Sequence, residues 1–195
     1  MHEFTHGTTN CLTGGGTGLC LQTTEAGGLG EGWSDTFAFV TEQKSAKPVD
    51  FVVGPYVFNN PGGLRSRPYS ISKSVNPYTY ARLQLLNEVH DIGEVWANIL
   101  VNVYYPLVRK YGFSRNLFDP RQKEGNIVFL HLFIDALSLQ PCNPTFLNAR
   151  DAIIQADVNR YRGRNKCLLW KAFASRGLGV RAANHIDDST VPRGC

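Results

Sequence analysis

Apolar residues recur at helical spacing over most of the chain. This pattern predicts helices over six ranges: 2–12, 30–43, 83–111, 127–140, 146–161 and 167–175. Gly112 is a natural stop for the longest helix, and Gly177 is a candidate C-cap for the last one. The sequence therefore predicts a mainly α-helical fold.

Two segments interrupt the helical pattern. Residues 13–29 are rich in glycine, which breaks helices, so we expect a connection without regular structure there. Residues 44–76 are rich in Pro, Gly, Ser and Asn with short apolar runs, which predicts irregular structure with one small hairpin. No internal repeat is present, and 195 residues suit a single domain.

The charge is mild, with a formal net value of +4. Lys and Arg are scattered, apart from a short run over 160–166 that indicates a solvated loop. A nucleic-acid surface needs a basic stripe with stacking aromatics, and a membrane helix needs roughly 18 apolar residues in a row. The sequence has neither, so we expect no nucleic-acid partner and no membrane segment. We also expect a monomer.

The strongest chemical signal is an HExxH motif over residues 2–6. Residues four apart share one face of a helix, so the imidazoles of His2 and His6 can bind one metal ion. Glu3 lies one step round the helix, where its carboxylate can take a proton from water. This arrangement is typical of zinc peptidases; the alternative is a solvated helix that carries two histidines by chance.

A catalytic zinc site needs three protein ligands and one open position. Glu31 and Asp35 lie four residues apart in a predicted helix and therefore share a face. We predict that Glu31 is the third ligand and that Asp35 accepts the outer N–H of a ligand histidine. Glu25 competes with Glu31, but its glycine-flanked context is less ordered, and a helix positions a ligand better than a loop does.

The blocks HEFTHG at 2–7 and GEGWSD at 30–35 resemble gluzincin metallopeptidases, and specifically the fungalysin family of secreted fungal metalloendopeptidases. Further blocks match in order: GLR at 63–65, RPYS at 67–70, NPYTY at 76–80, VHDIGEVWA at 89–97, LQPCNP at 139–144, ARDAII at 149–154 and WKAFA at 170–174. The resemblance covers nearly the whole chain. It implies the helical C-terminal subdomain of a thermolysin-like catalytic domain, with zinc as cofactor and proteins or peptides as substrates.

The resemblance also implies segments ahead of the motif. Met1 stands directly before the first predicted ligand, whereas fungalysin-like enzymes carry a signal, a propeptide and an N-terminal catalytic subdomain there. We therefore expect residues 1–195 to be the C-terminal helical part of a secreted, extracellular enzyme made as a zymogen, in a fragment or truncated gene model.

Two further roles follow from the resemblance. His90, in the VHDIGEVWA block, corresponds to the family histidine that stabilises the oxyanion, although a lone histidine on a helix is more often structural. Arg65 matches the arginine that holds the substrate carbonyl through a forked donor, and Arg67 is near enough to compete. Thermolysin-like enzymes often place a tyrosine between the HExxH helix and the third ligand, and residues 19–30 contain none.

The chain has five cysteines, so at least one thiol is unpaired or pairs elsewhere. Cys142 and Cys167 bracket a predicted helix and form one candidate disulfide, which would suit a secreted protein. Cys11, Cys20 and Cys195 compete for a second bridge, and spacing alone does not choose between them.

Two functions remain open. The first is a zinc endopeptidase with Glu3 as general base and, by resemblance, a hydrophobic pocket for the side chain after the scissile bond. The second is a catalytically incompetent fragment that acts at most as a binding module, because the half that pairs with an extended substrate would be missing. Upstream coding sequence that continues in frame into a sheet-forming domain favours the first function.

Overall fold

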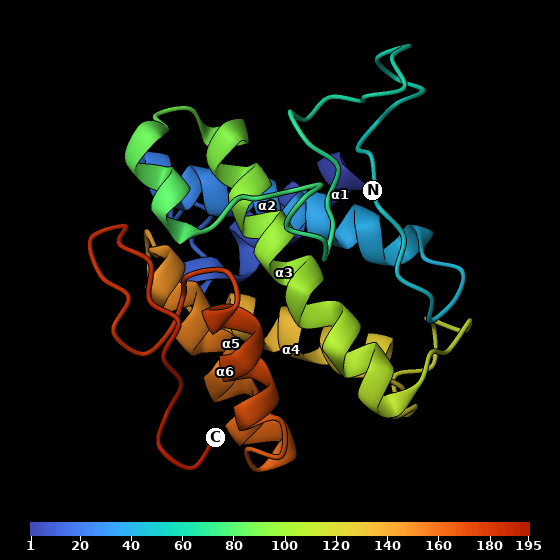
Figure 1. Cartoon of the computed structure of the whole chain (residues 1–195), viewed down its shortest axis with the longest axis vertical. Coiled ribbons are helices and arrows are strands. Elements are labelled where there is room, and N and C mark those ends of the chain that lie inside the picture. Colours follow the sequence, from blue (N-terminus) through green and yellow to red (C-terminus); the bar gives the residue numbers. More distant parts are fainter.

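The computed structural model describes all 195 residues and confirms the mainly α-helical fold (Figure 1). The helices are α1 (His2–Leu12), η1 (Thr13–Gly15), α2 (Thr24–Glu42), η2 (Tyr80–Leu85), α3 (Val89–Tyr111), α4 (Gly125–Leu139), α5 (Phe146–Tyr161) and α6 (Lys166–Ala174), where η marks short 3-10 helices. The only strand-like pairing between residues 44 and 76 is one antiparallel bridge, from Phe51 to Tyr69. The expected irregular segment is therefore present.

Helix α3 lies at the centre of the molecule and crosses it diagonally in Figure 1. Its Trp96 is fully buried and meets the edge of Trp33 from α2, with 5.3 Å between the ring centroids. The same indole packs against Phe146 of α5 and Phe173 of α6, with ring centroids 5.1 and 6.3 Å away. Large buried aromatics carry much of the hydrophobic stabilisation of a core, so this cluster fixes α2, α5 and α6 around α3.

Glycines set the closest approach of α2 to α3. A Cβ atom on Gly32 would lie 2.6 Å from the carbonyl oxygen of Gly93, and one on Gly93 would lie 2.5 Å from Cβ of Glu31. Both distances are too short for non-bonded atoms, so only glycine allows this contact. The two helix backbones therefore meet beside Glu31, and α3 forms one wall of the region around its carboxylate.

Two predicted helix starts were wrong. Helix α2 begins at Thr24 instead of residue 30, because its glycines are needed for the contact with α3, and that packing outweighs their low helix propensity. The side chain of Thr23 caps this start by accepting a hydrogen bond from Ala26 N–H. Helix α3 begins at Val89 instead of residue 83, because Glu88 caps it and residues 80–85 form a separate 3-10 helix.

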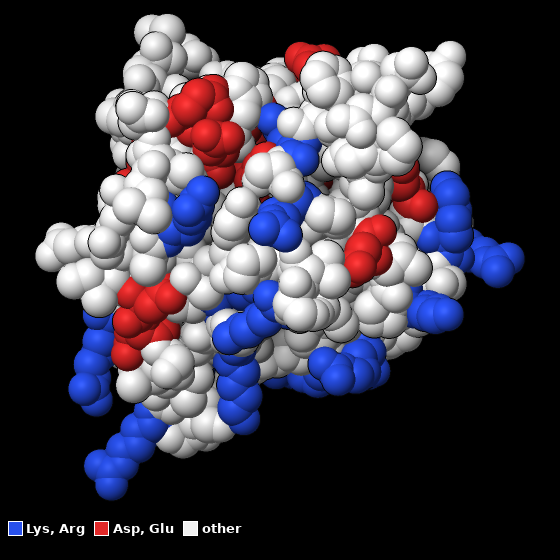
Figure 2. Space-filling model, turned by 45° about the horizontal axis from the view of Figure 1, so that its top comes forward, with Lys and Arg blue, Asp and Glu red and all other residues white.

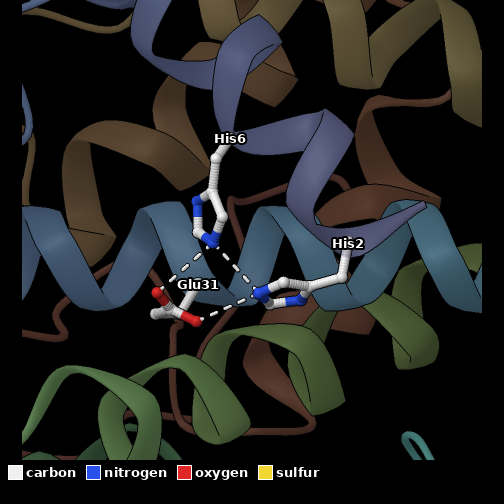
Figure 3. A group of neighbouring side chains, drawn as sticks. All are labelled: His2, His6 and Glu31. Atoms are coloured by element: carbon white, nitrogen blue, oxygen red, sulfur yellow. Dashed lines mark hydrogen bonds and ion pairs between the residues drawn. The ribbon is translucent and has the colours of Figure 1, made fainter. Parts of the chain in front are cut away.

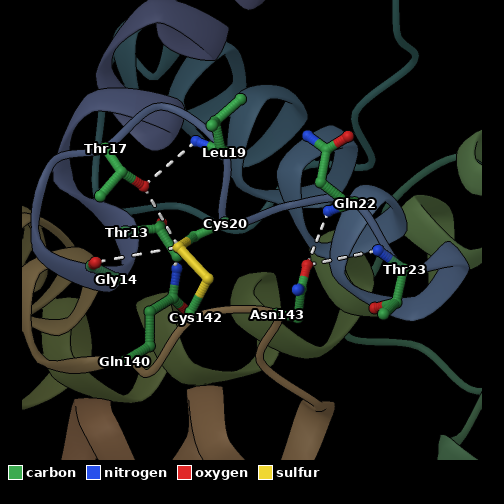
Figure 4. Close-up of a disulfide and its surroundings, with 10 residues drawn as sticks. All are labelled: Thr13, Gly14, Thr17, Leu19, Cys20, Gln22, Thr23, Gln140, Cys142 and Asn143. Carbon is green, nitrogen blue, oxygen red and sulfur yellow. Dashed lines mark hydrogen bonds between the residues drawn. A yellow bond between two sulfur atoms is a disulfide. The ribbon is translucent and has the colours of Figure 1, made fainter.

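The predicted disulfide from Cys142 to Cys167 was also wrong. Cys142 pairs with Cys20 (Figure 4). Cys167 pairs with Cys195, while Cys11 is free. Helix α5 separates Cys142 from Cys167, and its 16 residues extend about 24 Å, far beyond the span of a disulfide. The first bridge instead joins two segments that are 122 residues apart in sequence, and the second closes a loop at the C-terminal end.

Polar contacts beside the first bridge fix the connection between α1 and α2 (Figure 4). The side-chain oxygen of Asn143 accepts hydrogen bonds from the backbone N–H groups of Gln22 and Thr23, at 2.7 and 3.3 Å. The side-chain amide of Gln140 donates to the hydroxyl of Thr13 at 2.7 Å. The turn between α4 and α5 thus holds both ends of the glycine-rich segment.

Charged side chains of both signs are spread over the face drawn in Figure 2, with Lys and Arg gathering towards its lower edge. None of the helices combines the length and the apolar character that crossing a bilayer requires.

Candidate metal centre

Helix α1 presents two histidines from adjacent turns. The rings of His2 and His6 meet edge to face, with centroids 4.7 Å apart. Met1, at the N-cap, gives no side-chain cap, but its carbonyl accepts hydrogen bonds from the backbone N–H and the hydroxyl of Thr5, at 3.0 and 2.9 Å. The first turn, which carries His2, is therefore closed mainly through Thr5.

Helix α2 adds a carboxylate to this pair (Figure 3). The Nε2 atoms of His2 and His6 are 3.0 Å apart, and the two oxygens of Glu31 lie 3.3 Å from the first and 3.4 Å from the second. These are the only His, Cys, Asp or Glu side chains that form a cluster suited to a metal ion. The structure thus brings the three ligands predicted from sequence together.

Neighbouring groups on α2 fix the orientation of both imidazoles. Nδ1 of His2 lies 2.7 Å from the carboxylate of Asp35, which can only accept, so this nitrogen carries a hydrogen. The Ser34 hydroxyl donates to the carbonyl of Gly30 at 2.9 Å, which leaves it to accept from Nδ1 of His6 at 3.3 Å. When both rings are neutral, as metal binding requires, each Nε2 atom therefore carries a lone pair beside the other ring and beside Glu31.

This donor set fits a zinc ion. Two imidazole nitrogens and a carboxylate crowd together, which is unfavourable unless a proton or a metal cation lies among them. Zinc bonds of about 2.0–2.1 Å in tetrahedral geometry place ligand atoms roughly 3.3–3.4 Å apart. The two Nε2 atoms are 3.0 Å apart, and each has a different oxygen of Glu31 at 3.3 or 3.4 Å, which is near that spacing. Imidazole and carboxylate are also the ligand types of catalytic zinc sites.

The electrostatics of the cluster also favour a cation. Burial lowers the pKa of His2, but hydrogen bonds that its ring donates to the carboxylates of Asp35 and Glu31 outweigh this effect and raise that pKa to about 9. Burial raises the pKa of Glu31, whereas the hydrogen bond with His2 brings it below its ordinary value. The pKa of Asp35 is lowered too, by His2 and Arg65 against the effect of burial. Both carboxylates are therefore ionised at neutral pH.

Asp35 is fully buried and is the centre of a hydrogen-bond network. Besides His2, it accepts hydrogen bonds from Nε and Nη2 of Arg65, at 2.7 and 3.2 Å, and from the hydroxyl of Tyr69. Nη2 of Arg65 also lies 3.4 Å from Glu31, while Nη1 forms no hydrogen bond. Arg65 therefore lies beside the ligand cluster, with one amino group free for another partner. Sequence reasoning did not identify Tyr69, although it lies in the RPYS block.

His90 approaches the cluster from α3. Its Nε2 lies 3.6 Å from Glu31, and its side chain is 54% exposed. Nδ1 contacts the carboxylate of Glu88 at 2.6 Å, and the same carboxylate caps α3 by accepting from the N–H groups of His90 and Asp91. Glu88 thus both starts the helix and turns the ring towards Glu31. Sequence reasoning missed this role, although a carboxylate just before a helix is a recognisable cap signal.

Two other predicted residues, Glu3 and Glu25, are not part of the ligand cluster. Glu3 is exposed and forms no hydrogen bond or ion pair, and it lies on a shallow groove along α1. Glu25, the competing ligand, lies in the first turn of α2, where its carboxylate accepts the N–H of Phe146 at 2.8 Å and contacts His185 at 3.4 Å. Its context is ordered, contrary to expectation, and it is not part of the cluster with His2 and His6.

Comparison with known proteins shows the family to which this chain belongs. The family model for fungalysin metallopeptidases (M36) matches residues 1–182. The chain is 42% identical over 205 residues to extracellular metalloproteinase 2 of Arthroderma gypseum and 44% identical over 207 residues to extracellular metalloproteinase MEP of Pyricularia oryzae. It is 43% identical over 205 residues to extracellular metalloproteinase MEP of Neosartorya fischeri.

Each of these alignments covers all of this chain and 32–33% of the relative. The chain therefore spans about a third of the length of the curated relatives that it matches. Because the family model matches nearly the whole chain, the chain belongs to the fungalysin metallopeptidase family.

Proposed function

We propose that this chain forms the zinc site and the helical part of the catalytic centre of an extracellular endopeptidase. The observation that carries the proposal is the convergence of the Nε2 atoms of His2 and His6, 3.0 Å apart, with the carboxylate of Glu31, whose two oxygens lie 3.3 and 3.4 Å from them. Family membership supports it, since relatives are named extracellular metalloproteinases. The two disulfides suit an oxidising compartment, which supports secretion.

In this proposal His2, His6 and Glu31 hold the metal. When bound, zinc supplies Lewis acidity that lowers the pKa of water and polarises the peptide carbonyl. Glu3 takes the proton of the attacking water and delivers it to the leaving amine. Its exposure leaves the carboxylate free for that task, and no protein group competes for it.

Two donors complete the proposed centre. His90, with Nδ1 held by Glu88, directs Nε2 towards the cluster and stabilises the negative charge that develops on the carbonyl oxygen. Arg65, anchored on Asp35 through Nε and Nη2, offers its free Nη1 group to the substrate carbonyl on the leaving-group side. Substrates are proteins or peptides bound along the groove beside α1.

A zinc titration combined with hydrolysis of casein tests this function. We expect one zinc ion per chain, loss of that zinc in Glu31→Ala, and chelator-sensitive cleavage. Glu3→Gln keeps the zinc and loses hydrolysis, because the amide cannot accept the proton. Retained cleavage in Glu3→Gln would contradict the mechanism, and absence of bound zinc would contradict the site.

A second candidate is a binding module without catalysis, favoured by exposed apolar side chains near α1. Met1 and Phe4 are 71% and 74% exposed, and together with Phe118 they line one groove. Exposed apolar clusters mark surfaces that bind other proteins. The two functions differ in one result: zinc binding without cleavage, in this chain and in a version extended by its upstream coding sequence, supports the binding module.

A further inference from the structure

Two consecutive residues bridge the contact between α2 and α3. Arg65 donates from Nε to Asp35 on α2 at 2.7 Å. The next residue, Ser66, donates from its backbone N–H and from its hydroxyl to the two carboxylate oxygens of Glu94 on α3, each at 2.5 Å. The segment is therefore fixed to one helix through the guanidinium of Arg65 and to the other through Ser66.

Glu94 occupies a rigid position on α3. It follows Gly93, whose backbone touches α2 beside Glu31, and it lies one turn after His90 on the same helix. The residue is only 4% exposed. A buried carboxylate is costly unless both oxygens find donors, and Ser66 supplies one to each.

The contacts of Glu94 exclude a direct role at the metal. The ligand cluster comprises His2, His6 and Glu31, and Glu94 is not part of it. Both of its oxygens are taken by Ser66, whose hydroxyl also lies 2.9 Å from that of Tyr78. Any influence of Glu94 on the reaction therefore passes through the segment that it holds.

We propose that Glu94 is a positioning residue, which holds Ser66 so that the guanidinium of Arg65 stays aligned with Asp35 and the ligand cluster. This inference rests on the proposed function for its catalytic consequence. Because His90 and Glu94 share α3, one helix sets both substrate-facing donors, His90 directly and Arg65 through Ser66. The two donors then keep a fixed separation across the site.

Two substitutions distinguish the contribution of the length of the Glu94 side chain from that of its charge. Glu94→Gln keeps the length of the side chain: its carbonyl accepts from Ser66 N–H, and its amide donates to the hydroxyl, which then donates to Tyr78. Glu94→Asp keeps the charge but is one methylene shorter and cannot reach both groups of Ser66. Positioning predicts that the Gln variant resembles wild type and the Asp variant does not.

The first test measures kcat and KM for a peptide substrate on the zinc-loaded chain. We expect Glu94→Asp to lower kcat on the order of 100-fold, as a displaced catalytic group does, and Glu94→Gln to stay near wild type. In an Arg65→Ala background, Glu94→Asp should have no further effect, because the residue acts through Arg65. Additive losses, or an equally impaired Gln variant, would overturn the proposal.

The second test does not depend on activity. Exchange of the Nε–H proton of Arg65 with water, followed by NMR, reports whether its bond to Asp35 persists. We expect Glu94→Asp to accelerate this exchange by about tenfold or more and Glu94→Gln to leave it unchanged. Asp91 is an exposed carboxylate on the same helix without contact to Ser66. Asp91→Asn is therefore the matched control and should not change the exchange rate.

These readouts separate the two proposals. If the zinc-loaded wild type cleaves no peptide, the proposed function fails, while exchange at Arg65 still decides whether Glu94 positions it. Unchanged exchange in a folded Glu94→Asp variant contradicts the positioning role even if hydrolysis is intact. Ser66→Ala, which removes only the hydroxyl, should give an intermediate exchange rate and guards against misfolding of the Glu94 variants.

Discussion

Two parts of the site differ in how the fold holds them: helix α1 and the contact between α2 and α3. Helix α1 buries only Thr5 and Thr9 and has no side-chain N-cap. Helix α2 buries most of its length, is capped by Thr23 and meets α3 through glycine. The exposed helix carries two of the three proposed ligands, and the buried pair carries the third.

The difference shows which part supplies spacing and which supplies orientation. Helix α1 sets the separation of His2 and His6 by its own geometry. The direction of each ring is set from α2, by Asp35 for His2 and by Ser34 for His6. A weakly packed helix can therefore present accurate ligands, provided that a rigid neighbour orients them.

Among the substitutions that test this difference between α1 and the α2–α3 contact, removal of the first disulfide should cause the largest loss of stability. Replacing Cys20 and Cys142 together by Ser opens a loop of 122 residues and frees the connection between α1 and α2. We expect a loss of about 2–5 kcal/mol in the free energy of unfolding. Urea denaturation of the oxidised proteins measures it. Cys11→Ser, at the exposed free cysteine, is the control and should leave the midpoint unchanged.

Gly32→Ala tests the rigid contact directly. The new methyl group would lie 2.6 Å from the carbonyl oxygen of Gly93 and 2.7 Å from Cβ of Trp96, so the helices must separate. We expect a loss of about 1–3 kcal/mol in stability. Weaker zinc binding should accompany it, because Glu31 is the adjacent residue. Denaturation and zinc titration measure the two effects, and an unchanged stability would show that the contact is not rigid.

Asp35→Asn tests the orientation supplied by α2. The amide loses the charge and places a donor among the donors of His2 and Arg65, so the ring of His2 is no longer held. We expect zinc affinity to fall about 10–100-fold. Competition with a chromophoric chelator measures it. Asp135→Asn, which disrupts a surface ion pair with Arg160, should leave the affinity unchanged.

Gly7→Ala should cause the smallest change in the free energy of unfolding, and this change should be a gain in stability. A Cβ atom on Gly7 would meet no atom within 4 Å, so alanine adds helix propensity to α1 without a clash. We expect a gain of about 0.4–1 kcal/mol and unchanged zinc affinity. Thermal unfolding measures it. Read beside Gly32→Ala, the same substitution then has opposite consequences in the two parts of the site.

The spacing of residues along the sequence was sufficient to predict much of the candidate site and of the fold. The bounds of α1 and α5 match those predicted, because each helix ends at a clear local boundary, with glycines shortly after its last residue. The HExxH spacing placed His2 and His6 together, and the four-residue spacing on α2 placed Glu31 and Asp35 on one face.

Glycines misled the prediction where they serve packing. The start of α2 was placed six residues too late, because the contact of Gly32 with Gly93 involves a segment about 60 residues away. For the same reason Glu25 seemed disordered, although it lies in a helix and binds the backbone of Phe146. Neither fact can be read from neighbouring residues.

The sequence by itself determined the helices, the candidate ligands and the family, since helical period and motif spacing are local properties of the chain. Only the tertiary structure decided which cysteines pair, how Asp35 and Ser34 orient the histidines, and how Glu94 holds Ser66. Those contacts join segments separated by 28 to 122 residues. They form because packing around α3 brings them together, and no local pattern encodes that arrangement.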